Sequence, residues 1–564
     1  MSKSNLLFTE KDIELLDENI DRIKEEVELI KNEMFNPPME IKRKILSEVL
    51  KFVVEKKRKI YGGFALNELI KMDGRGTPIY TDDSVNDIDF YTPDPINDAI
   101  DLSDRLHKLK LGNVKCMEAV HDETYSVKVD GEVYCDISYT PKNIYNRMPF
   151  KTSKDGLILI HPHFMWIDYL RMLTDPINSW FRIEKSYTRF QILQRYYQFP
   201  QNLSGIDVGD STPDLDIALH NVLEFLKDRE TTTTIGFYAY NCFLEESQAI
   251  TGMARSKKSS SKNDRNRGRT SDATLKYIDV PYYEFISTNY KDDVLELIEK
   301  LKSSFPDKDD TITHVEYYPF FQYTGFSTNI YCNGDIVAKI HTNNKRCLPY
   351  HDIKSKFYSK IKADHHDFGG KIRIGTFSLT LLFNIVNLQK HRTNNEDDMK
   401  ELSYVMTSHL LHMRNFYFDR TNKNILDETL FKEMEIKCIG KTLTTFMEKA
   451  LRIEQRKKEG RRYTFNYDPS VTISKRPVLM FANSSGNPIN NPKNLKLSDE
   501  DESDDSNNGN SNDNADKDNS DVDDDADSNS NGSNNGDGDG DDSGDEDGTD
   551  TGNNDNSKVK NKDV

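Results

Sequence analysis

Cysteine is scarce in this chain of 564 residues, and its six cysteines lie far apart. None of them has the CxxC spacing of a zinc site, and small disulfide-rich domains carry cysteine at much higher density. The sequence therefore predicts neither a zinc site nor a disulfide framework, and it favours a reducing, cytosolic setting. The cysteines are Cys116, Cys135, Cys242, Cys332, Cys347 and Cys438.

Long apolar runs are also missing. No stretch approaches the roughly 20 apolar residues that cross a bilayer, and the first residues, MSKSNLLFTEKD, lack the apolar core of a signal peptide. We therefore expect a soluble protein without a membrane partner. The length is sufficient for two or three domains, each with its own core.

Positive charge is too scarce to balance the acidic residues of the whole chain, but this imbalance comes from one segment. The formal net charge is −19, and the segment from Asp499 to Val564 alone carries 24 acidic residues against four lysines. This segment is largely Asp, Asn, Ser and Gly, which cannot bury enough apolar surface to offset chain entropy. We expect a disordered acidic tail over 498–564 that aids solubility, binds a partner or competes for the protein's own basic surface. The rest of the chain is nearly neutral, so a nucleic-acid partner is not excluded.

Two helices are expected before the first segment that carries chemistry. Apolar residues recur at helical spacing through 11–57, with an interruption at 36–38. The next residues, KIYGGFALNELI at 59–70, indicate a short strand, a tight Gly62-Gly63 loop and a helix. Glycine lets a backbone approach closely and free N–H groups at a helix N-terminus favour an anion, so this loop is a candidate phosphate site.

Three aspartates form the second candidate site. NDIDFYT at 86–92 has the composition of a strand, and side chains two apart share one face, so Asp87 and Asp89 project together. Asp136 lies in 124–140, where two alternating runs flank an Asp-Gly dipeptide typical of hairpin turns. If these strands are neighbours, the three carboxylates converge, and protonation or bound cations must relieve their repulsion.

Carboxylate oxygens suit magnesium or manganese, and two such ions about 3.5–4 Å apart support in-line phosphoryl displacement. We therefore expect two Mg²⁺ (or Mn²⁺) ions, with Asp87, Asp89 and Asp136 as metal ligands and catalytic residues of a nucleotidyl transfer. For the paired aspartates taken alone, the alternative is a chance DxD on a solvated strand edge. The ordered combination of glycine loop, paired aspartates and hairpin aspartate is more specific.

The segments YGGFALNEL, NDIDFY and VYCDISY resemble the poly(A) polymerase catalytic subunits of large DNA viruses, in the polymerase β-type nucleotidyltransferase superfamily. The similarity is remote to the poxvirus type and closer to mimivirus-like giant viruses, over about residues 40–480. It implies an α/β (α+β) fold, ATP as donor, an RNA 3′ end as acceptor, and a location in the host cytoplasm or the virion. By this resemblance Asp87 and Asp89 would hold both ions, and Asp136 would share one and help to deprotonate the RNA 3′-hydroxyl.

One departure from the family concerns the glycine loop. Many relatives have Gly-Ser where this chain has Gly62-Gly63, so backbone N–H groups would have to replace a serine contact to the triphosphate. Farther along, Arg182, Lys185 and Arg189 recur at helical spacing and form a basic stripe. We expect this stripe to contact the triphosphate or the RNA backbone, with a solvated helix face as the alternative.

A second, degenerate copy of the same pattern follows. Residues 222–243 resemble 49–69 with one inserted residue, which places Gly236 on Gly62. YIDV at 277–280 resembles DIDF, and TNIYCNGDIVAKI at 328–340 resembles the hairpin.

In this register Tyr277, Asp279 and Lys339 replace the three aspartates, and one carboxylate with a lysine cannot hold two divalent ions. Chance similarity is the alternative. The predicted organisation is an N-terminal helical segment (1–40), a catalytic nucleotidyltransferase domain (41–200), a non-catalytic nucleotidyltransferase-like domain (215–480) and the acidic tail (498–564).

A basic loop at 254–270 interrupts the second copy. Such a segment offers sequence-independent, salt-sensitive contacts to RNA phosphates, with a nuclear localisation signal as the competing interpretation. The candidate RNA-binding residues are Arg255, Lys257, Lys258, Lys262, Arg265, Arg267 and Arg269.

Other functions fit the same residues. The aspartates alone do not separate a poly(A) polymerase from a uridylyltransferase, a CCA-adding enzyme or an oligoadenylate synthase, and only the resemblance points to adenylate. A non-catalytic RNA-binding or processivity subunit is the alternative from another class, and the intact aspartates argue against it. By resemblance, a homodimer is expected.

Overall fold

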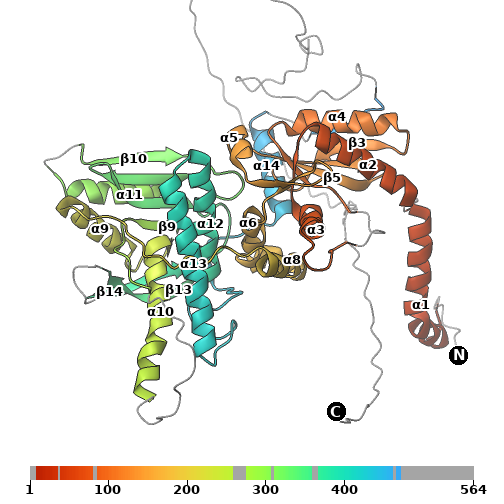
Figure 1. Cartoon of the computed structure of the whole chain (residues 1–564). Helices are drawn as coiled ribbons and strands as arrows, with labels where there is room; N and C mark the ends of the chain where they lie inside the picture. The colour runs from red at the N-terminus through yellow and green to blue at the C-terminus, as the bar shows by residue number, and fades with distance from the viewer. Residues whose placement is uncertain are drawn as a thin grey trace, which may run out of the picture. The chain divides into compact units, whose positions relative to one another are not determined.

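The computed structural model describes residues 8–35, 39–80, 86–257, 275–306, 310–358, 366–460 and 465–471. Within these ranges the chain forms two mixed sheets of eight strands each, with helices packed against them (Figure 1). This confirms the predicted α/β (α+β) class. None of the helices in these ranges is both long enough and apolar enough to span a bilayer.

Sheet one is built from the first part of the chain and one short strand from much later. Its spatial order is β16-β3-β4-β5-β2-β1-β7-β6. Strand β1 pairs antiparallel with β2 and parallel with β7, and β2 pairs parallel with β5. The strands are β1 (Lys59–Ile60), β2 (Phe90–Thr92), β3 (Val114–Glu118), β4 (Thr124–Val129), β5 (Glu132–Tyr139), β6 (Phe150–Thr152), β7 (Ile158–Ile160) and β16 (Asn466–Tyr467).

Sheet two has the spatial order β10-β11-β12-β9-β8-β14-β13-β15. Strand β8 pairs antiparallel with β9 and parallel with β14, and β9 pairs parallel with β12. The strands are β8 (Thr232–Ile235), β9 (Tyr283–Ser287), β10 (Ile312–Tyr317), β11 (Ser327–Cys332), β12 (Asp335–Thr342), β13 (Leu348–Phe357), β14 (His366–Gly375) and β15 (Cys438–Ile439).

The two sheets share one topology. From β3 to β6 in sheet one and from β10 to β13 in sheet two, the strands correspond in order and in relative direction. Helices also correspond: α2 and α4 pack on sheet one as α9 and α11 pack on sheet two. The second half of the chain therefore repeats the fold of the first, as the sequence pattern predicted.

The helices begin and end at the following residues. They are α1 (Glu10–Phe35), α2 (Met39–Glu55), α3 (Gly62–Asp73), α4 (Pro95–Lys108), α5 (Lys142–Arg147), α6 (Pro162–Leu173), α7 (Pro176–Ser179), α8 (Ile183–Tyr196), α9 (Pro213–Leu226), α10 (Gly236–Lys257), α11 (Tyr290–Ser303), α12 (Phe377–Asn394), α13 (Asp397–Arg420) and α14 (Thr445–Lys458). A 3₁₀ turn, η1 (Trp180–Arg182), precedes α8.

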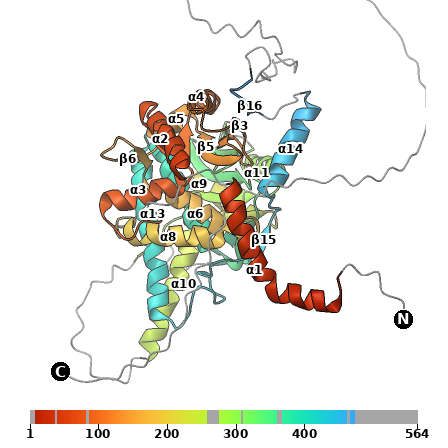
Figure 2. The ribbon, with the colours of Figure 1, turned by 90° about the vertical axis from the view of Figure 1, so that its right-hand side faces the viewer.

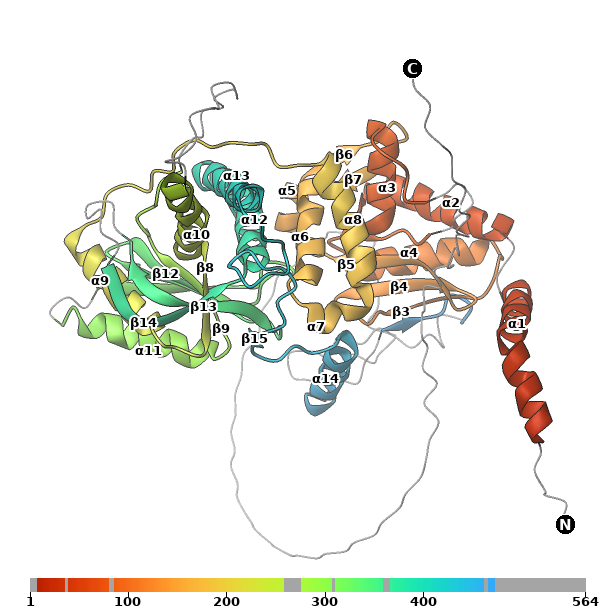
Figure 3. The same ribbon diagram turned by 90° about the horizontal axis from the view of Figure 1, so that it is seen from below.

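Helices of the second half contact those of the first. Helices α10 and α13 run side by side in both Figure 1 and Figure 2, and α12 packs against α13. Helix α12 also lies against α6, as the view from below in Figure 3 shows. Buried side chains of both halves form one continuous apolar cluster, so the two sheets share a core.

Local sequence explains the elements around the predicted site. Asp130 and Gly131 both have positive φ, 52° and 90°, as a two-residue hairpin turn between β4 and β5 requires. Helix α3 begins at Gly62 with φ 71° and ends before Gly74 with φ 61°, whose N–H bonds the last helical carbonyls. The predicted hairpin and the predicted strand-glycine-helix segment are both confirmed.

The chain returns to sheet one near its end. Strand β16 pairs with β3, and Arg456 on α14 forms an ion pair of 2.7 Å with buried Glu118. Arg452 on the same helix pairs with Asp122 at 3.2 Å. The predicted range 215–480 of the second domain thus contains a strand of sheet one, and the basic cluster on α14 holds the helix to the first half.

The structure contradicts the expectation of no disulfide. Cys347 and Cys438 form one, with Cα atoms 5.5 Å apart. Antiparallel pairing of β13 with β15 brings them together, although 91 residues separate them in sequence. Sequence spacing could not show this, because only the sheet brings the two strands side by side.

We predict that the Cys438→Ser substitution lowers the free energy of unfolding by about 3–4 kcal/mol, because it releases a long closed loop in the unfolded chain. Urea unfolding with and without dithiothreitol measures the effect. Reductant should lower the stability of the wild type and leave that of the variant unchanged. Six reactive thiols in the denatured, unreduced wild type would contradict the prediction.

Candidate nucleotidyl-transfer site

Asp87 and Asp89 were predicted to lie within a strand over 86–92, but they lie in the segment just before β2. Strand pairing begins only at Phe90, but the segment before it is extended and held on both sides. The Ile88 N–H donates to the carbonyl of Tyr134 at 3.1 Å, and the carbonyl of Asp89 accepts from the Tyr61 N–H at 2.9 Å. Ile88 is fully buried, so alternation directs the two carboxylates to the opposite face.

Asp136 lies on β5, which runs parallel to β2. Phe90 pairs with Ile137, so Asp89 and Asp136 occupy the preceding positions on neighbouring strands. Ser126 on β4 faces Asp136 and donates a hydrogen bond of 2.6 Å to its Oδ1. Sequence reasoning missed Ser126, because a bulge at Tyr134 in β5 shifts the hairpin register by one residue.

The electrostatics confirm that the three carboxylates are close together. Burial raises the pKa of Asp89 well above its usual value, and the charges of Asp87 and Asp136 raise it further. Burial also raises the pKa of Asp136 to about 6, against the Ser126 hydrogen bond and with Asp87 adding repulsion. Three ionised carboxylates are therefore unfavourable here without a nearby positive charge.

Gly62 is required by the approach of Asp89. A Cβ atom at Gly62 would lie 2.7 Å from Asp89 Oδ2, and the positive φ of 71° also favours glycine. The N-terminus of α3 thus lies against the acidic cluster, and Tyr61 provides no side-chain cap for its N–H groups. Both Gly62 and Gly63 lie where the sequence predicted a phosphate site.

The predicted basic stripe divides between two elements. Arg182 ends the turn η1, while Lys185 and Arg189 lie on α8. The positive charges of Arg189 and Arg182 lower the pKa of Asp89, and that of Arg182 also lowers the pKa of Asp136. Lys185 is exposed on α8 between them. Two of the three predicted cations therefore lie close enough to influence the carboxylates.

The donor set fits divalent cations. Within the described ranges, no three His, Cys, Asp or Glu side chains are already gathered around one point as a metal site. Asp89 Oδ1, however, is buried and accepts no hydrogen bond from any described residue. Hard carboxylate oxygens beside such an atom match the ligands that Mg²⁺ and Mn²⁺ prefer.

The corresponding place in sheet two has different residues from those predicted. Glu284 faces Lys339 across the parallel strands β9 and β12, and it lies 2.9 Å from a Cβ placed on Gly236, as Asp89 lies against Gly62. Tyr282, two residues earlier, stands where Asp87 does. The prediction of Lys339 is confirmed, but Tyr277 and Asp279 were wrong, because they precede β9.

Hydrogen bonds within the protein fill this place in sheet two. Lys339 Nζ bonds Tyr282 Oη at 3.0 Å, and Glu284 binds His341 Nε2 and Asn387 Nδ2 at 2.9 Å each. Burial alone would raise the pKa of Glu284, but His341, Lys339 and Asn387 lower it to about 2. The carboxylate is thus satisfied by protein groups.

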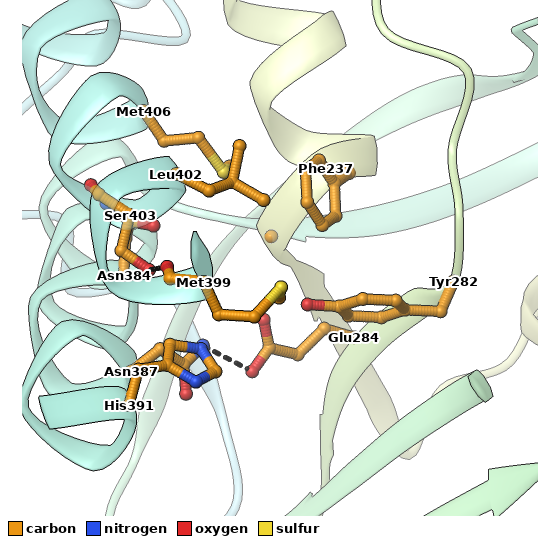
Figure 4. Close-up of a pocket in the computed structure, with 11 residues that line it drawn as sticks. Phe237, Tyr282, Glu284, Asn384, Asn387, His391, Met399, Leu402, Ser403 and Met406 are labelled. Carbon is orange, nitrogen blue, oxygen red and sulfur yellow. Dashed lines mark hydrogen bonds between the residues drawn. The ribbon is translucent and has the colours of Figure 1, made fainter. Parts of the chain in front are cut away.

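Apolar side chains close the space in front of Glu284. Figure 4 shows Phe237, Tyr282 and Met399 around this small cavity, with Leu402 and Met406 beyond them. The ring of Phe237 packs edge-on against Tyr282, with centroids 5.2 Å apart. Among the described residues that line this cavity, Glu284 is the only carboxylate, so the cavity does not offer the set of carboxylates that two divalent ions require.

The predicted RNA-binding loop lies almost wholly outside the described residues. Arg255 and Lys257 are in the last turn of α10, and Lys258, Lys262, Arg265, Arg267 and Arg269 fall in the part of the chain that the structure does not describe. The predicted acidic tail also lies outside the described ranges. The role of both segments stays a prediction.

Comparison with known families gives matches over both halves of the chain. Residues 47–179 match the family described as "Poly(A) polymerase catalytic subunit". Residues 218–499 match a second model, for the C-terminal part of the mimivirus-type catalytic subunit.

Individual relatives agree with these matches. The chain is 30% identical to a poly(A) polymerase catalytic subunit of Acanthamoeba polyphaga mimivirus over 516 residues, 87% of this chain and 85% of that protein. A counterpart in African swine fever virus is 29% identical over 161 residues, 28% and 33% of the two chains. The crystal structure of the Megavirus polyadenylate synthase superposes with a TM-score of 0.67 at 28% identity, covering 88% of this chain and 95% of that one. The chain that carries the three aspartates on sheet one is therefore a member of the viral poly(A) polymerase catalytic subunit family.

Proposed function

We propose that this protein adds adenylate residues to RNA 3′ ends from ATP, without a template, at the acidic end of sheet one. The observation that carries the proposal is the convergence of Asp87, Asp89 and Asp136, with one buried carboxylate oxygen that accepts no hydrogen bond from the described residues. Membership of the family supports adenylate as the product. The activity would take place in the host cytoplasm, as the resemblance to giant-virus enzymes implies.

Each group has a defined task in this reaction. Asp87 and Asp89 would hold two divalent ions, and Asp136, oriented by Ser126, would share one of them. When bound, these ions lower the pKa of the RNA 3′-hydroxyl and neutralise charge on the leaving pyrophosphate. The N-terminus of α3 and the cations Arg182 and Arg189 would bind the triphosphate.

Sheet two would have a structural or RNA-binding task. Lys339 and Tyr282 stand where Asp136 and Asp87 do in sheet one, and neither is a ligand for Mg²⁺. A single active site in each chain follows. A uridylyl or CCA-adding specificity stays the alternative, because the residues around the nucleobase are not identified.

We predict that Asp87→Asn lowers the rate of RNA extension with ATP and Mg²⁺ by about a thousandfold or more, equivalent to about 4 kcal/mol, because it removes a ligand of the transition-state cations. Primer extension with each of the four nucleotides measures both rate and base choice. ATP should be used in preference to UTP and CTP.

Tyr282→Phe is the matched control, since it alters the corresponding position of sheet two. This variant should extend RNA at the wild-type rate. Full activity of Asp87→Asn, or equal use of UTP, would contradict the proposed function.

Metal removal should change stability in a way that depends on the cluster. In EDTA, Asp87→Asn should raise the free energy of unfolding by about 1 kcal/mol, because it removes one of three crowded charges. Saturating Mg²⁺ should stabilise the wild type, by about 2.7 kcal/mol at 100 times Kd, and stabilise the variant much less. Equal gains in both proteins, measured by urea unfolding, would place the ions elsewhere.

Removal of 255–269 should weaken RNA binding and flatten its salt dependence. If all seven basic side chains contact phosphates, the slope of log K against log salt falls by up to about 5, at roughly 0.7 for each contact to a single strand. Fluorescence anisotropy with oligo(A) at several salt concentrations measures the slope. An unchanged slope would exclude the loop as an RNA contact.

A further inference from the structure

Gly63, at the second position of α3, lies beneath two polar side chains. A Cβ atom at this position would be 2.2 Å from Tyr80 Oη and 2.7 Å from Arg189 Nη2. Contacts this short would displace both groups. The absence of a side chain at Gly63 is therefore a condition for the present positions of Tyr80 and Arg189.

Tyr80 is fixed through its backbone and through its hydroxyl. Its N–H donates to Asn67 Oδ1 on α3 at 3.0 Å, and its hydroxyl accepts from Arg189 Nη2 at 2.7 Å. The positive charge of Arg189 also lies close enough to buried Tyr169 to lower the pKa of that side chain, against the larger effect of burial, which raises it. Because a guanidinium can only donate, the hydroxyl proton of Tyr80 is directed to a different acceptor.

Sheet two provides a comparison within the same chain. Asn241 Oδ1 accepts from the Ile278 N–H at 2.9 Å, just as Asn67 accepts from Tyr80. Ile278 has no hydroxyl, and Phe237 stands at the position of Gly63 and fills the space itself. The second half, which lacks the three aspartates, thus also has no glycine at the position of Gly63 and no tyrosine at the position of Tyr80. This association favours a functional purpose for Tyr80 over a purely structural one.

We propose that Tyr80, held in place by Arg189, binds the triphosphate of the incoming nucleotide through its hydroxyl. The inference rests on the proposed function, which brings the triphosphate to the N-terminus of α3. Three kinds of donor meet there: the uncapped N–H groups of α3, the Arg189 guanidinium and the Tyr80 hydroxyl. Together they would bind phosphate oxygens in the absence of any side chain at Gly63.

The test is the Tyr80→Phe variant, which removes only the hydroxyl. The Kd for ATP with Mg²⁺ and the KM for ATP should rise about five- to tenfold, as expected for one lost hydrogen bond to a charged group, while kcat changes less than twofold. Isothermal titration calorimetry without RNA gives Kd independently of activity. Inorganic triphosphate should lose affinity by the same factor.

A double mutant tests the geometry. Gly63→Ser should weaken ATP binding in the wild type, because the new side chain displaces Tyr80 and Arg189. In the Tyr80→Phe background the same substitution should cost less affinity than in the wild type, because only the contact with Arg189 remains. Additive losses would contradict the proposed contact.

Tyr467→Phe is the matched control. Tyr467 lies on the edge strand β16, and the substitution removes a hydroxyl that donates to Asp104 at 2.6 Å. Its ATP affinity should equal that of the wild type. Wild-type binding of ATP and triphosphate by Tyr80→Phe, with Asp87→Asn inactive, would overturn this inference and leave the proposed function intact. A fall in kcat that tracks a lower melting temperature would assign Tyr80 a structural role and overturn it too.

Discussion

Repulsion among three carboxylates is the constraint on which the first half of this protein depends. Two of them come from one extended segment and the third from the neighbouring parallel strand, so the backbone fixes their proximity. Burial and mutual charge raise the pKa of Asp89 well above its usual value. The surrounding groups reduce this repulsion. Ser126 donates a hydrogen bond to Asp136, and Arg182 and Arg189 supply positive charge. A substrate that arrives with divalent cations would complete the neutralisation.

The second half shows what the same topology becomes when this constraint is removed. Lys339 lies where an aspartate would repel Glu284, and His341 and Asn387 complete the hydrogen bonds of that carboxylate. Phe237 fills the space that a glycine leaves open in sheet one. The shared strand order therefore accompanies two different sets of side chains, and the residues at the strand ends distinguish the two halves.

Local sequence patterns were sufficient to predict the main elements of the first half. An Asp-Gly turn between alternating runs, a glycine pair before a helix and two aspartates at alternate positions each follow from short-range geometry, and the structure places them as neighbours. The second half was harder. Its glycine turn and hairpin were aligned correctly, but YIDV matched DIDF only in its letters, because the true strand is the following segment with Glu284.

Other features depend on contacts that sequence spacing does not encode. A bulge in β5 places Ser126 opposite Asp136, and a loop between α3 and β2 carries Tyr80 back over Gly63. The disulfide joins cysteines 91 residues apart through strand pairing. Each of these three contacts depends on how distant segments pack in the folded chain.

The most direct test of a single active site is the position of bound metal. A crystal soaked with Mn²⁺ and a non-hydrolysable ATP analogue would show the ions by anomalous scattering. We expect anomalous peaks beside Asp87, Asp89 and Asp136, and none beside Glu284. Peaks beside Glu284, or an acidic cluster on sheet one that stays without metal when the nucleotide is bound, would contradict this assignment.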